Sequence, residues 1–306
     1  MSPLVLLSAW VVFWNPDSLE SFRKHAIDEA LAEWIACTPE GRAVRRTDFD
    51  KERAEFLKIA KGKRMRIYAM ASNFGASGFE AKLVQSFLGD PAKRARHVQD
   101  LVGIVVEDGF HGLDLDYESL EAGDRDGFSL FVEELGKSLR SKGKKLSIAV
   151  HAKTSEPGNW GGTIAQDWKR LGAAVDVFRV MTYDQHWATS DAGPIAGNAW
   201  AEQVMRFALS QMPASKVELG LSGYGYDWTS KPARSLVWKD WSGKATAVDA
   251  ESGEYVDGQA RFSGLPAYRA KVALARKLGL RGVALWYLGS EEPGLMDLFP
   301  QVKAKR

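Results

Sequence analysis

The sequence predicts an α/β protein with a (β/α)8 TIM barrel, and three observations support this fold class. Eight short, strand-like apolar runs are distributed along a chain of 306 residues. Amphipathic helical patterns lie between them along most of the chain. Polar or aromatic residues follow several different strands, as active-site residues do in such barrels. A doubly wound open sheet is the alternative, and it is less favoured because its functional residues would gather near one switch point.

The elements are predicted from the period of the apolar residues. The predicted strands cover residues 4–13, 31–37, 66–71, 112–117, 146–150, 177–183, 217–221 and 282–286. Helices are predicted where apolar residues recur at three-and-four spacing, as they do along 98–105, 128–139 and 266–278. Asp17 followed by Glu20 resembles a capping box that opens the first helix. The single cysteine, Cys37, is expected to be a buried strand residue, and it excludes an internal disulfide framework.

One stretch interrupts the alternation of strands and helices. Residues 229–264 are rich in Ser, Gly, Asp and Lys, and they carry turn signals at 249–253 and at Asp257-Gly258. These features predict a short hairpin-like insertion between the seventh strand and its helix. Such a loop either forms a wall of a functional site or is a decoration of the barrel. The simplest organisation is a single catalytic domain, 1–306, that contains this insertion.

Charge and hydropathy exclude several classes of function. The 41 Lys and Arg residues against 39 Asp and Glu residues leave a net charge of +2, and no long basic run is present, so nucleic acid is not an expected partner. No apolar stretch reaches the roughly 18 residues that span a bilayer, so membrane insertion is not expected. The apolar N-terminus has no basic residues before it, and we interpret it as a first strand rather than a signal peptide.

An unusual row of acidic residues lies in the fourth predicted strand. Asp114, Asp116 and Glu118 are spaced two residues apart, so an extended strand would point them to one face. A solvated strand face would normally mix both signs of charge, whereas here the intervening residues are Leu115 and Tyr117. Crowded carboxylates cannot all ionise freely, and at least one pKa should rise toward the range of a general acid. The row therefore predicts acid and base chemistry.

Four motifs in order along the chain carry a resemblance to a known family. The run His111-Gly-Leu-Asp-Leu-Asp-Tyr-Glu118 resembles the DxxDxDxE signature of glycoside hydrolase family 18, the chitinase-like barrels. The runs 181–184 (Met-Thr-Tyr-Asp), 220–225 and 282–286 are similar to the family's motifs on strands six, seven and eight. Flanking sequence at 181–187 and 223–228 resembles the bacterial branch of spore-cortex-lytic and other peptidoglycan-associated N-acetylglucosaminidases. His111 departs from the family pattern, which has aspartate there, and the change affects local support at the strand's entry end.

The resemblance implies a role for each catalytic residue. Glu118 would protonate the glycosidic oxygen, while the substrate's own 2-acetamido oxygen acts as the nucleophile. Asp116 would accept a hydrogen bond from the acetamido N–H and stabilise the oxazolinium-like intermediate. Asp114 would share a proton with Asp116 and help to keep Glu118 protonated, so the three carboxyl groups titrate as one coupled set. Tyr183 would donate its hydroxyl to the acetamido oxygen and orient it for attack.

The same resemblance implies a set of substrate-binding residues. Asp184 would bind sugar hydroxyls at the cleavage point, and Trp286 would form the apolar floor under the reacting sugar. The remaining candidates are aromatic or belong to the same motifs, and they are Met181, Tyr224, Trp187 and Trp10. Trp160 is a second loop aromatic that could stack on a sugar. The other tryptophans considered, Trp14, Trp34, Trp168 and Trp200, are predicted to be core residues.

Two other functions compete with this interpretation. A metal-dependent barrel hydrolase could use Asp114, Asp116, His151 and His186 as ligands, but the chain has neither a His-x-His on its first strand nor a His-Glu-x-x-His motif. A chitinase-like lectin would bind N-acetylglucosamine without cleaving it, but such proteins typically replace the acid that Glu118 retains. We therefore expect an enzyme that requires no cofactor or metal, with the non-catalytic lectin as the alternative.

The expected partner is an oligo- or polysaccharide that contains N-acetylglucosamine. Chitin, peptidoglycan and N-glycan cores all present a 2-acetamido sugar, so the substrate stays open, as does endo or exo action. The insertion is shorter than in processive chitinases, and this predicts a shallower cleft that suits short chains or chain ends. A monomer that is secreted or associated with a bacterial cell envelope is expected.

Overall fold

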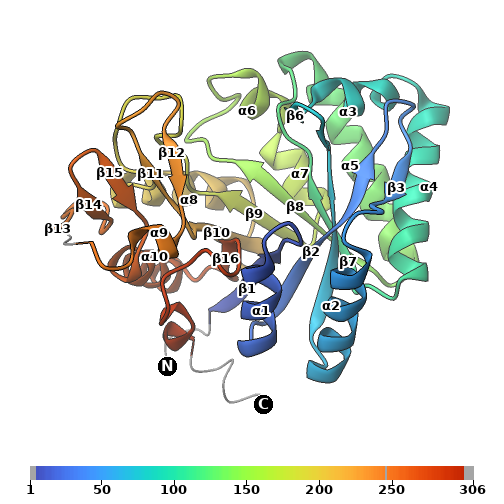
Figure 1. Cartoon of the computed structure of the whole chain (residues 1–306). Helices are drawn as coiled ribbons and strands as arrows, with labels where there is room; N and C mark the ends of the chain where they lie inside the picture. Colours follow the sequence, from blue (N-terminus) through green and yellow to red (C-terminus); the bar gives the residue numbers. More distant parts are fainter. Residues whose placement is uncertain (1–4, 245–246, 300–306) are drawn as a thin grey trace. The chain divides into compact units, whose positions relative to one another are not determined.

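The computed structural model describes residues 5–244 and 247–299 of the chain. These residues form two compact units, and Figure 1 labels their helices and strands. The central unit comprises 29–180 and 207–217, and the terminal unit comprises the described residues of 1–28, 181–206 and 218–306.

The central unit contains a parallel sheet with one antiparallel edge strand. Its strands follow the order β9-β8-β7-β4-β2-β3. Their bounds are β2 Glu29–Cys37, β3 Ala43–Arg45, β4 Arg66–Ser72, β7 Gly112–Asp116, β8 Lys145–His151 and β9 Val177–Met181. The pairings of β2 with β4, β4 with β7 and β7 with β8 are parallel, whereas β3 pairs with β2 in the antiparallel sense. Ser72 is in register with Asp116, so β4 and β7 end side by side.

Helices follow the strands of the central unit, and two of them show the predicted apolar stripe. Their bounds are α2 Asp50–Lys63, α3 Ala81–Leu88, α4 Pro91–Glu107, α5 Arg125–Ser141, α6 Gly161–Ala165 and α7 Trp168–Ala174. Asp90 caps α4 by accepting from the backbone N–H groups of Ala92 and Lys93. The predicted stripes of α4 and α5 are buried, and each large apolar side chain contributes roughly 1.5–3 kcal/mol by leaving water. A short hairpin, β5 Phe74–Gly75 and β6 Gly78–Phe79, follows β4, and a 3-10 turn, Ala122–Asp124, precedes α5.

The terminal unit contains three parallel strands in the order β1-β16-β10. They are β1 Leu6–Val11, β10 Val217–Ser222 and β16 Gly282–Trp286, and the helices are α1 Pro16–Lys24, α8 Asn198–Gln211 and α10 Leu265–Lys277. A short 3-10 turn occurs at Leu295–Leu298, and another, Ala214–Lys216, belongs to the central unit. The predicted capping box at Asp17 is wrong: Asn15 caps α1, accepting from the Asp17 backbone N–H at 3.0 Å. Pro16 takes the first helical position, which it tolerates because no N–H is needed there.

A small antiparallel sheet lies between β10 and α10 along the chain. Its strand order is β12-β11-β15-β14-β13. The bounds are β11 Gly225–Asp227, β12 Arg234–Leu236, β13 Ala247–Val248, β14 Tyr255–Asp257 and β15 Ala260–Phe262, with a short helix, α9 Trp238–Trp241, after β12. This sheet has its own buried cluster, formed by Leu236, Trp241, Ala260 and Phe262. It begins at Gly225, four residues before the stretch that the sequence marks as an insertion, and residues 245–246 of that stretch lie outside the described residues.

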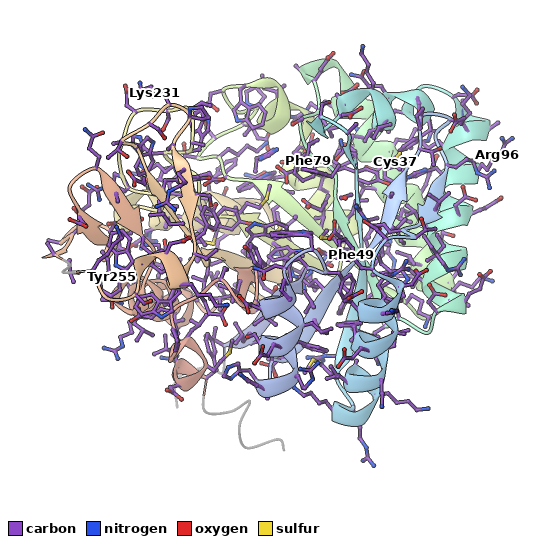
Figure 2. All side chains as sticks on the ribbon, viewed as in Figure 1. Cys37, Phe49, Phe79, Arg96, Lys231 and Tyr255 are labelled. Carbon is purple, nitrogen blue, oxygen red and sulfur yellow. The ribbon has the colours of Figure 1, made fainter. Side chains whose placement is uncertain are left out.

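The fold class is the predicted (β/α)8 TIM barrel. All eight predicted strands are present, as β1, β2, β4, β7, β8, β9, β10 and β16. Cys37, labelled in Figure 2, is a buried strand residue as expected. Burial raises the pKa of its thiol to about 12. Within 5–244 and 247–299, the helices are all too short or too polar to cross a membrane.

Candidate functional site

Asp114, the first residue of the acidic row, is a fully paired buried carboxylate. It lies in the middle of β7 and is 0% exposed. Its Oδ1 accepts from Ser147 Oγ at 2.5 Å and from Arg179 Nη1 at 2.9 Å. Because a guanidinium is always charged, Asp114 is held beside a fixed positive charge.

Arg179 also connects Asp114 to a second buried acid. Its Nη2 lies 3.0 Å from Glu29 Oε2, and Arg66 Nε reaches the other Glu29 oxygen at 3.3 Å. Arg179 and Glu29 are both 0% exposed. Sequence reasoning missed this network, although one signal was available, since Arg179 is a charged residue within an otherwise apolar strand run. A buried network of this kind is costly to break, because removing one member leaves a charge unpaired.

Asp116, the second residue of the row, is also buried, but it lacks the strong pairing that Asp114 has. It is the last residue of β7 and is 4% exposed. Burial raises its pKa to about 7, the charges of Asp114 and Glu33 add to this rise, and a hydrogen bond with Glu118 opposes it. Its Oδ1 has no hydrogen-bond partner within the part of the chain that the structure describes. Asp116 is therefore a carboxyl group that can take up or release a proton near neutral pH.

Glu118 lies two residues beyond the end of β7. Its backbone N–H donates to Asn73 Oδ1, and its backbone carbonyl accepts from Asn73 Nδ2, both at 2.9 Å. Its side chain is 17% exposed, and Oε2 lies 3.5 Å from Nε2 of His151. Burial lowers the pKa of His151 to about 4. The imidazole is thus neutral near pH 7, and it places no positive charge beside Glu118.

A second group of predicted residues gathers around Asp184 in the terminal unit. Asp184 follows β9 with a φ of +55°, a conformation that aspartate tolerates better than most residues. Its Oδ1 accepts from the hydroxyl groups of Tyr224 at 2.7 Å and Tyr226 at 3.1 Å. Burial raises the pKa of Asp184, and the two tyrosine hydrogen bonds oppose that rise. Sequence reasoning identified Tyr224 but missed Tyr226, although both belong to one Tyr-Gly-Tyr run.

Three further predicted residues pack beside this group. Tyr183 is buried in one apolar cluster with Tyr224, and the partly buried Met181 and Trp286 pack against that cluster. The rings of Tyr183 and Tyr224 meet edge to face with centroids 6.1 Å apart. The structure thus brings together Met181, Tyr183, Asp184, Tyr224 and Trp286 within the terminal unit.

The predicted aromatic residues Trp10 and Trp187 differ in exposure. Trp10 is only 2% exposed and meets Trp286 edge to face at a centroid distance of 5.7 Å, so it is placed to support Trp286 rather than to contact a sugar. Trp187 is 49% exposed, and its Nε1 donates to Thr189 Oγ1 at 2.8 Å. This hydrogen bond holds an exposed indole on the loop after β9.

The remaining tryptophans test the core predictions. Trp34 and Trp168 are buried as predicted, and Trp200 is intermediate. The prediction for Trp14 is wrong: it is half exposed and meets Tyr287 edge to face at 4.9 Å. Trp14 lies in the turn between β1 and the cap of α1, where the chain has left the sheet. Trp160 is 46% exposed, with its ring centroid 4.7 Å from that of His151.

Two of the histidines, His111 and His186, take part in local contacts with the backbone. Nδ1 of His111 accepts from the Ile67 backbone N–H at 3.2 Å, which supports the start of β7. Nδ1 of His186 lies 3.0 Å from the Asp191 carbonyl oxygen on an exposed loop. Among residues 5–244 and 247–299, no group of three or more His, Cys, Asp or Glu side chains is arranged to hold a metal ion.

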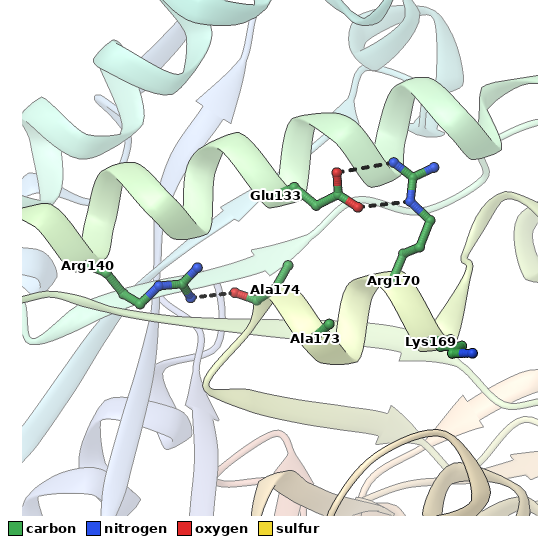
Figure 3. Close-up of a pocket in the computed structure, with 6 residues that line it drawn as sticks. All are labelled: Glu133, Arg140, Lys169, Arg170, Ala173 and Ala174. Atoms are coloured by element: carbon green, nitrogen blue, oxygen red, sulfur yellow. Dashed lines mark hydrogen bonds and ion pairs between the residues drawn. The ribbon is translucent and has the colours of Figure 1, made fainter.

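A separate pocket of about 440 Å³ lies along α5 and α7 of the central unit (Figure 3). Its lining residues are Glu133, Arg140, Lys169, Arg170, Ala173 and Ala174. Glu133 binds Arg170 through two hydrogen bonds, at 2.8 and 3.1 Å, and Arg140 donates to the Ala174 carbonyl at 2.7 Å. Because its only carboxylate is already paired, this pocket is a weaker catalytic candidate than the acidic row.

Comparison with known proteins gives consistent matches. The sequence profile of "Glycosyl hydrolases family 18" matches residues 43–291. The "Uncharacterized glycosylase YvbX" of Bacillus subtilis is 25% identical over 255 residues, which cover 77% of this chain and 74% of that protein. The "Cortical fragment-lytic enzyme" of Bacillus subtilis is 26% identical over 272 residues, covering 80% of this chain and 63% of its own length. A solved chitinase from Chromobacterium violaceum has the same fold, with a TM-score of 0.86, 24% identity, and coverage of 99% of this chain and 100% of that one.

Proposed function

Because the chain belongs to glycosyl hydrolases family 18, a family of glycosidases, we propose that it cleaves β-linked N-acetylglucosamine glycans by a retaining, substrate-assisted mechanism. In this mechanism the nucleophile comes from the substrate, so the protein needs one acid and one orienting carboxylate rather than two catalytic carboxylates of the ordinary kind. Glu118 is the proposed general acid and base. Asp116 is the proposed orienting group.

The proposal rests on the different surroundings of the three carboxyl groups in the acidic row. Asp114 is paired with Arg179, Asp116 has a pKa raised to about 7, and Glu118 is the most exposed of the three. Oδ1 of Asp114 already accepts from Ser147 and Arg179, so we propose that Asp116 and Glu118 are the pair that shares the proton. The neutral His151 beside Glu118 supports this, because an imidazolium there would favour loss of the acid's proton.

The proposed reaction has two steps. In the first, Glu118 donates its proton to the glycosidic oxygen while the acetamido carbonyl oxygen attacks C1 and the C1–O bond to the leaving group breaks. Asp116 then accepts a hydrogen bond from the acetamido N–H of the oxazolinium-like intermediate. In the second step, the Glu118 carboxylate takes a proton from water, whose oxygen attacks C1 and reopens the ring. Two inversions at C1 give net retention, and Glu118 regains its proton.

Residues of the terminal unit are proposed to hold the sugar. Tyr183 would donate to the acetamido oxygen, and Asp184, fixed by Tyr224, would accept from sugar hydroxyls. Trp286 and Met181 would form the apolar surface under the ring, with Trp10 supporting Trp286 and Trp187 stacking on a sugar farther along. We propose a monomer with one catalytic domain, 1–306, in which 229–264 form an insertion.

The first experiment compares the wild type with Glu118→Gln on a chromogenic N-acetylglucosamine oligomer. We expect the variant to lose activity by about 10³-fold or more while it still binds the oligomer, since the acid contributes to the transition state and little to binding. The wild-type product should have the β configuration when it is first released, as judged by NMR. A wild type that binds without cleaving would make the protein a lectin, and a fully active Glu118→Gln would overturn the mechanism.

The substrate class is tested separately. The glycosylases and cortex-lytic enzymes among the relatives lead us to propose peptidoglycan glycan strands as the substrate in preference to chitin. Incubation with chitotetraose and with purified peptidoglycan, followed by mass spectrometry of the products, separates the two. We expect faster release of muropeptide fragments than of chitobiose, and the opposite order would assign the protein to chitin oligosaccharides.

A further inference from the structure

Asn73 makes an unusual double contact with the backbone of the proposed acid. It directly follows β4 and is 0% exposed. Its Oδ1 accepts from the Glu118 N–H and its Nδ2 donates to the Glu118 carbonyl, both at 2.9 Å. The same Nδ2 also donates to the Glu80 carbonyl at 3.1 Å. Both polar atoms of one buried amide are therefore used on backbone groups.

The contact extends the sheet beyond its last backbone pairing. Parallel pairing of β4 with β7 ends at Ser72 and Asp116, two residues before Glu118. The side chain of Asn73 then offers one acceptor and one donor, as a neighbouring strand would. Immediately after Glu118 the chain turns away, since Ser119 has a φ of +56°. Replacing Asn73 would therefore remove two hydrogen bonds from the backbone of Glu118.

Asn73 also binds the backbone of Glu80, at the end of the β5–β6 hairpin. The Glu80 N–H donates to the Asn73 backbone carbonyl at 3.1 Å, so Asn73 and Glu80 close the base of the hairpin. Within the hairpin, the Ser77 N–H and Oγ both donate to Glu80 Oε1 at 3.1 Å. These hydrogen bonds leave the side chain of Asn73 little freedom to change its rotamer.

We propose that Asn73 is a positioning residue that fixes the carboxyl group of Glu118 in the geometry needed for proton transfer. This inference rests on the proposed role of Glu118 as the general acid. It does not place Asn73 in contact with substrate. Proton transfer tolerates little displacement, and a shift of the acid by about 1 Å costs on the order of 10²-fold in rate.

The test uses leaving groups that differ in their need for an acid. Two glycosides of N,N′-diacetylchitobiose are compared, one with a 2,4-dinitrophenyl group, which departs without protonation, and one with a sugar as the leaving group. We expect Asn73→Ala to lower the first-turnover rate about 10²-fold on the sugar and less than about 5-fold on the dinitrophenyl glycoside. KM should be unchanged within about 2-fold on both substrates.

Two further variants make the test specific. Ser129→Ala removes another buried hydrogen bond of the central unit, from Oγ to the Arg125 carbonyl at 2.8 Å within α5, and should change both rates equally and by less than 2-fold. If Asn73→Ala does not fold, Asn73→Asp keeps the side-chain volume and one acceptor, and the same selective loss is expected. Equal losses on the two substrates, or full activity on both, would overturn the inference.

Glu118→Gln separates this inference from the proposed function. It should show the same selectivity for leaving group as Asn73→Ala, with a larger loss on the sugar. If Glu118→Gln is selective and the Asn73 variants are not, the function stands and the positioning role falls. If Glu118→Gln shows no selectivity, the proposed acid is wrong, and the inference about Asn73 falls with it.

Discussion

Asp116 in the central unit and Asp184 in the terminal unit are both buried aspartates, and burial raises the pKa of each. Their hydrogen bonds differ. Oδ1 of Asp184 accepts from two tyrosine hydroxyls, whereas Oδ1 of Asp116 has no partner among the described residues. The tyrosines hold Asp184 as a fixed acceptor. Asp116 retains both an available oxygen and a proton that exchanges near neutral pH, which suits a group that changes partners during a reaction.

Replacing each aspartate by asparagine tests this difference in role directly, and it should give the largest effect of the comparison. Asp116→Asn should lower kcat by about 10²- to 10³-fold, because a neutral amide cannot stabilise a developing positive charge. Asp184→Asn should act mainly on KM, with kcat reduced less than about 10-fold, because its role is binding. Steady-state kinetics on the chromogenic oligomer measure both. Equal losses in kcat would show that the two aspartates do not differ in role.

Asp114 offers a second contrast, since it is the fully paired neighbour of Asp116. Arg179→Met should lower the free energy of unfolding by about 3–5 kcal/mol, because it removes the buried cation that Asp114 and Glu29 share. Urea denaturation at pH 7 measures the change. Arg140→Met is the matched control, since Arg140 is exposed and donates a hydrogen bond to the Ala174 carbonyl, and it should cost less than about 1.5 kcal/mol. An equal cost for the two variants would mean that the buried network contributes no special stability.

The acidic row shows how much could be predicted from sequence. The two-residue spacing of Asp114, Asp116 and Glu118 identified the row, because a strand has a fixed side-chain period. Likewise, the apolar period of β7 and α5 is a local property, and both elements were predicted. Arg179 and Asn73 could not be assigned, because their partners lie 65 and 45 residues away in the chain and only the register of the sheet brings them into contact. Trp14 failed for a related reason: its type favours the core, but the turn before α1 decides its exposure.

The pH dependence of the free energy of unfolding tests whether folding raises the pKa of Asp116. An unfolded Asp116 loses its proton near its ordinary pKa of 3.8, whereas the folded protein holds it until about pH 7. The folded state therefore binds more protons between these values, and the free energy of unfolding falls as the pH rises through this window. Asp116→Asn mimics the protonated form and removes this loss.

We therefore expect Asp116→Asn to gain about 2–4 kcal/mol relative to the wild type when the pH is raised from 4 to 8. Urea denaturation of both proteins at the two pH values gives the difference, in which the contributions of titrating groups remote from Asp116 cancel. Asp126→Asn is the control, because the side chain of Asp126 is 95% exposed, and it should show no such gain. A parallel pH dependence of the wild type and Asp116→Asn would mean that folding does not raise the pKa of Asp116.

The smallest expected effect concerns the two tyrosines that fix Asp184. Tyr224→Phe should lower kcat/KM about 5- to 10-fold, since it removes a buried hydrogen bond of 2.7 Å worth about 1 kcal/mol. Tyr226→Phe should cost less, about 2- to 3-fold, because its bond is 3.1 Å long and its side chain is half-buried, so water can replace the hydroxyl. Kinetics of the two variants and of the double variant give the order and the coupling. If both tyrosines can be replaced without loss, Asp184 is not held as a fixed acceptor, and the difference from Asp116 must then arise from burial alone.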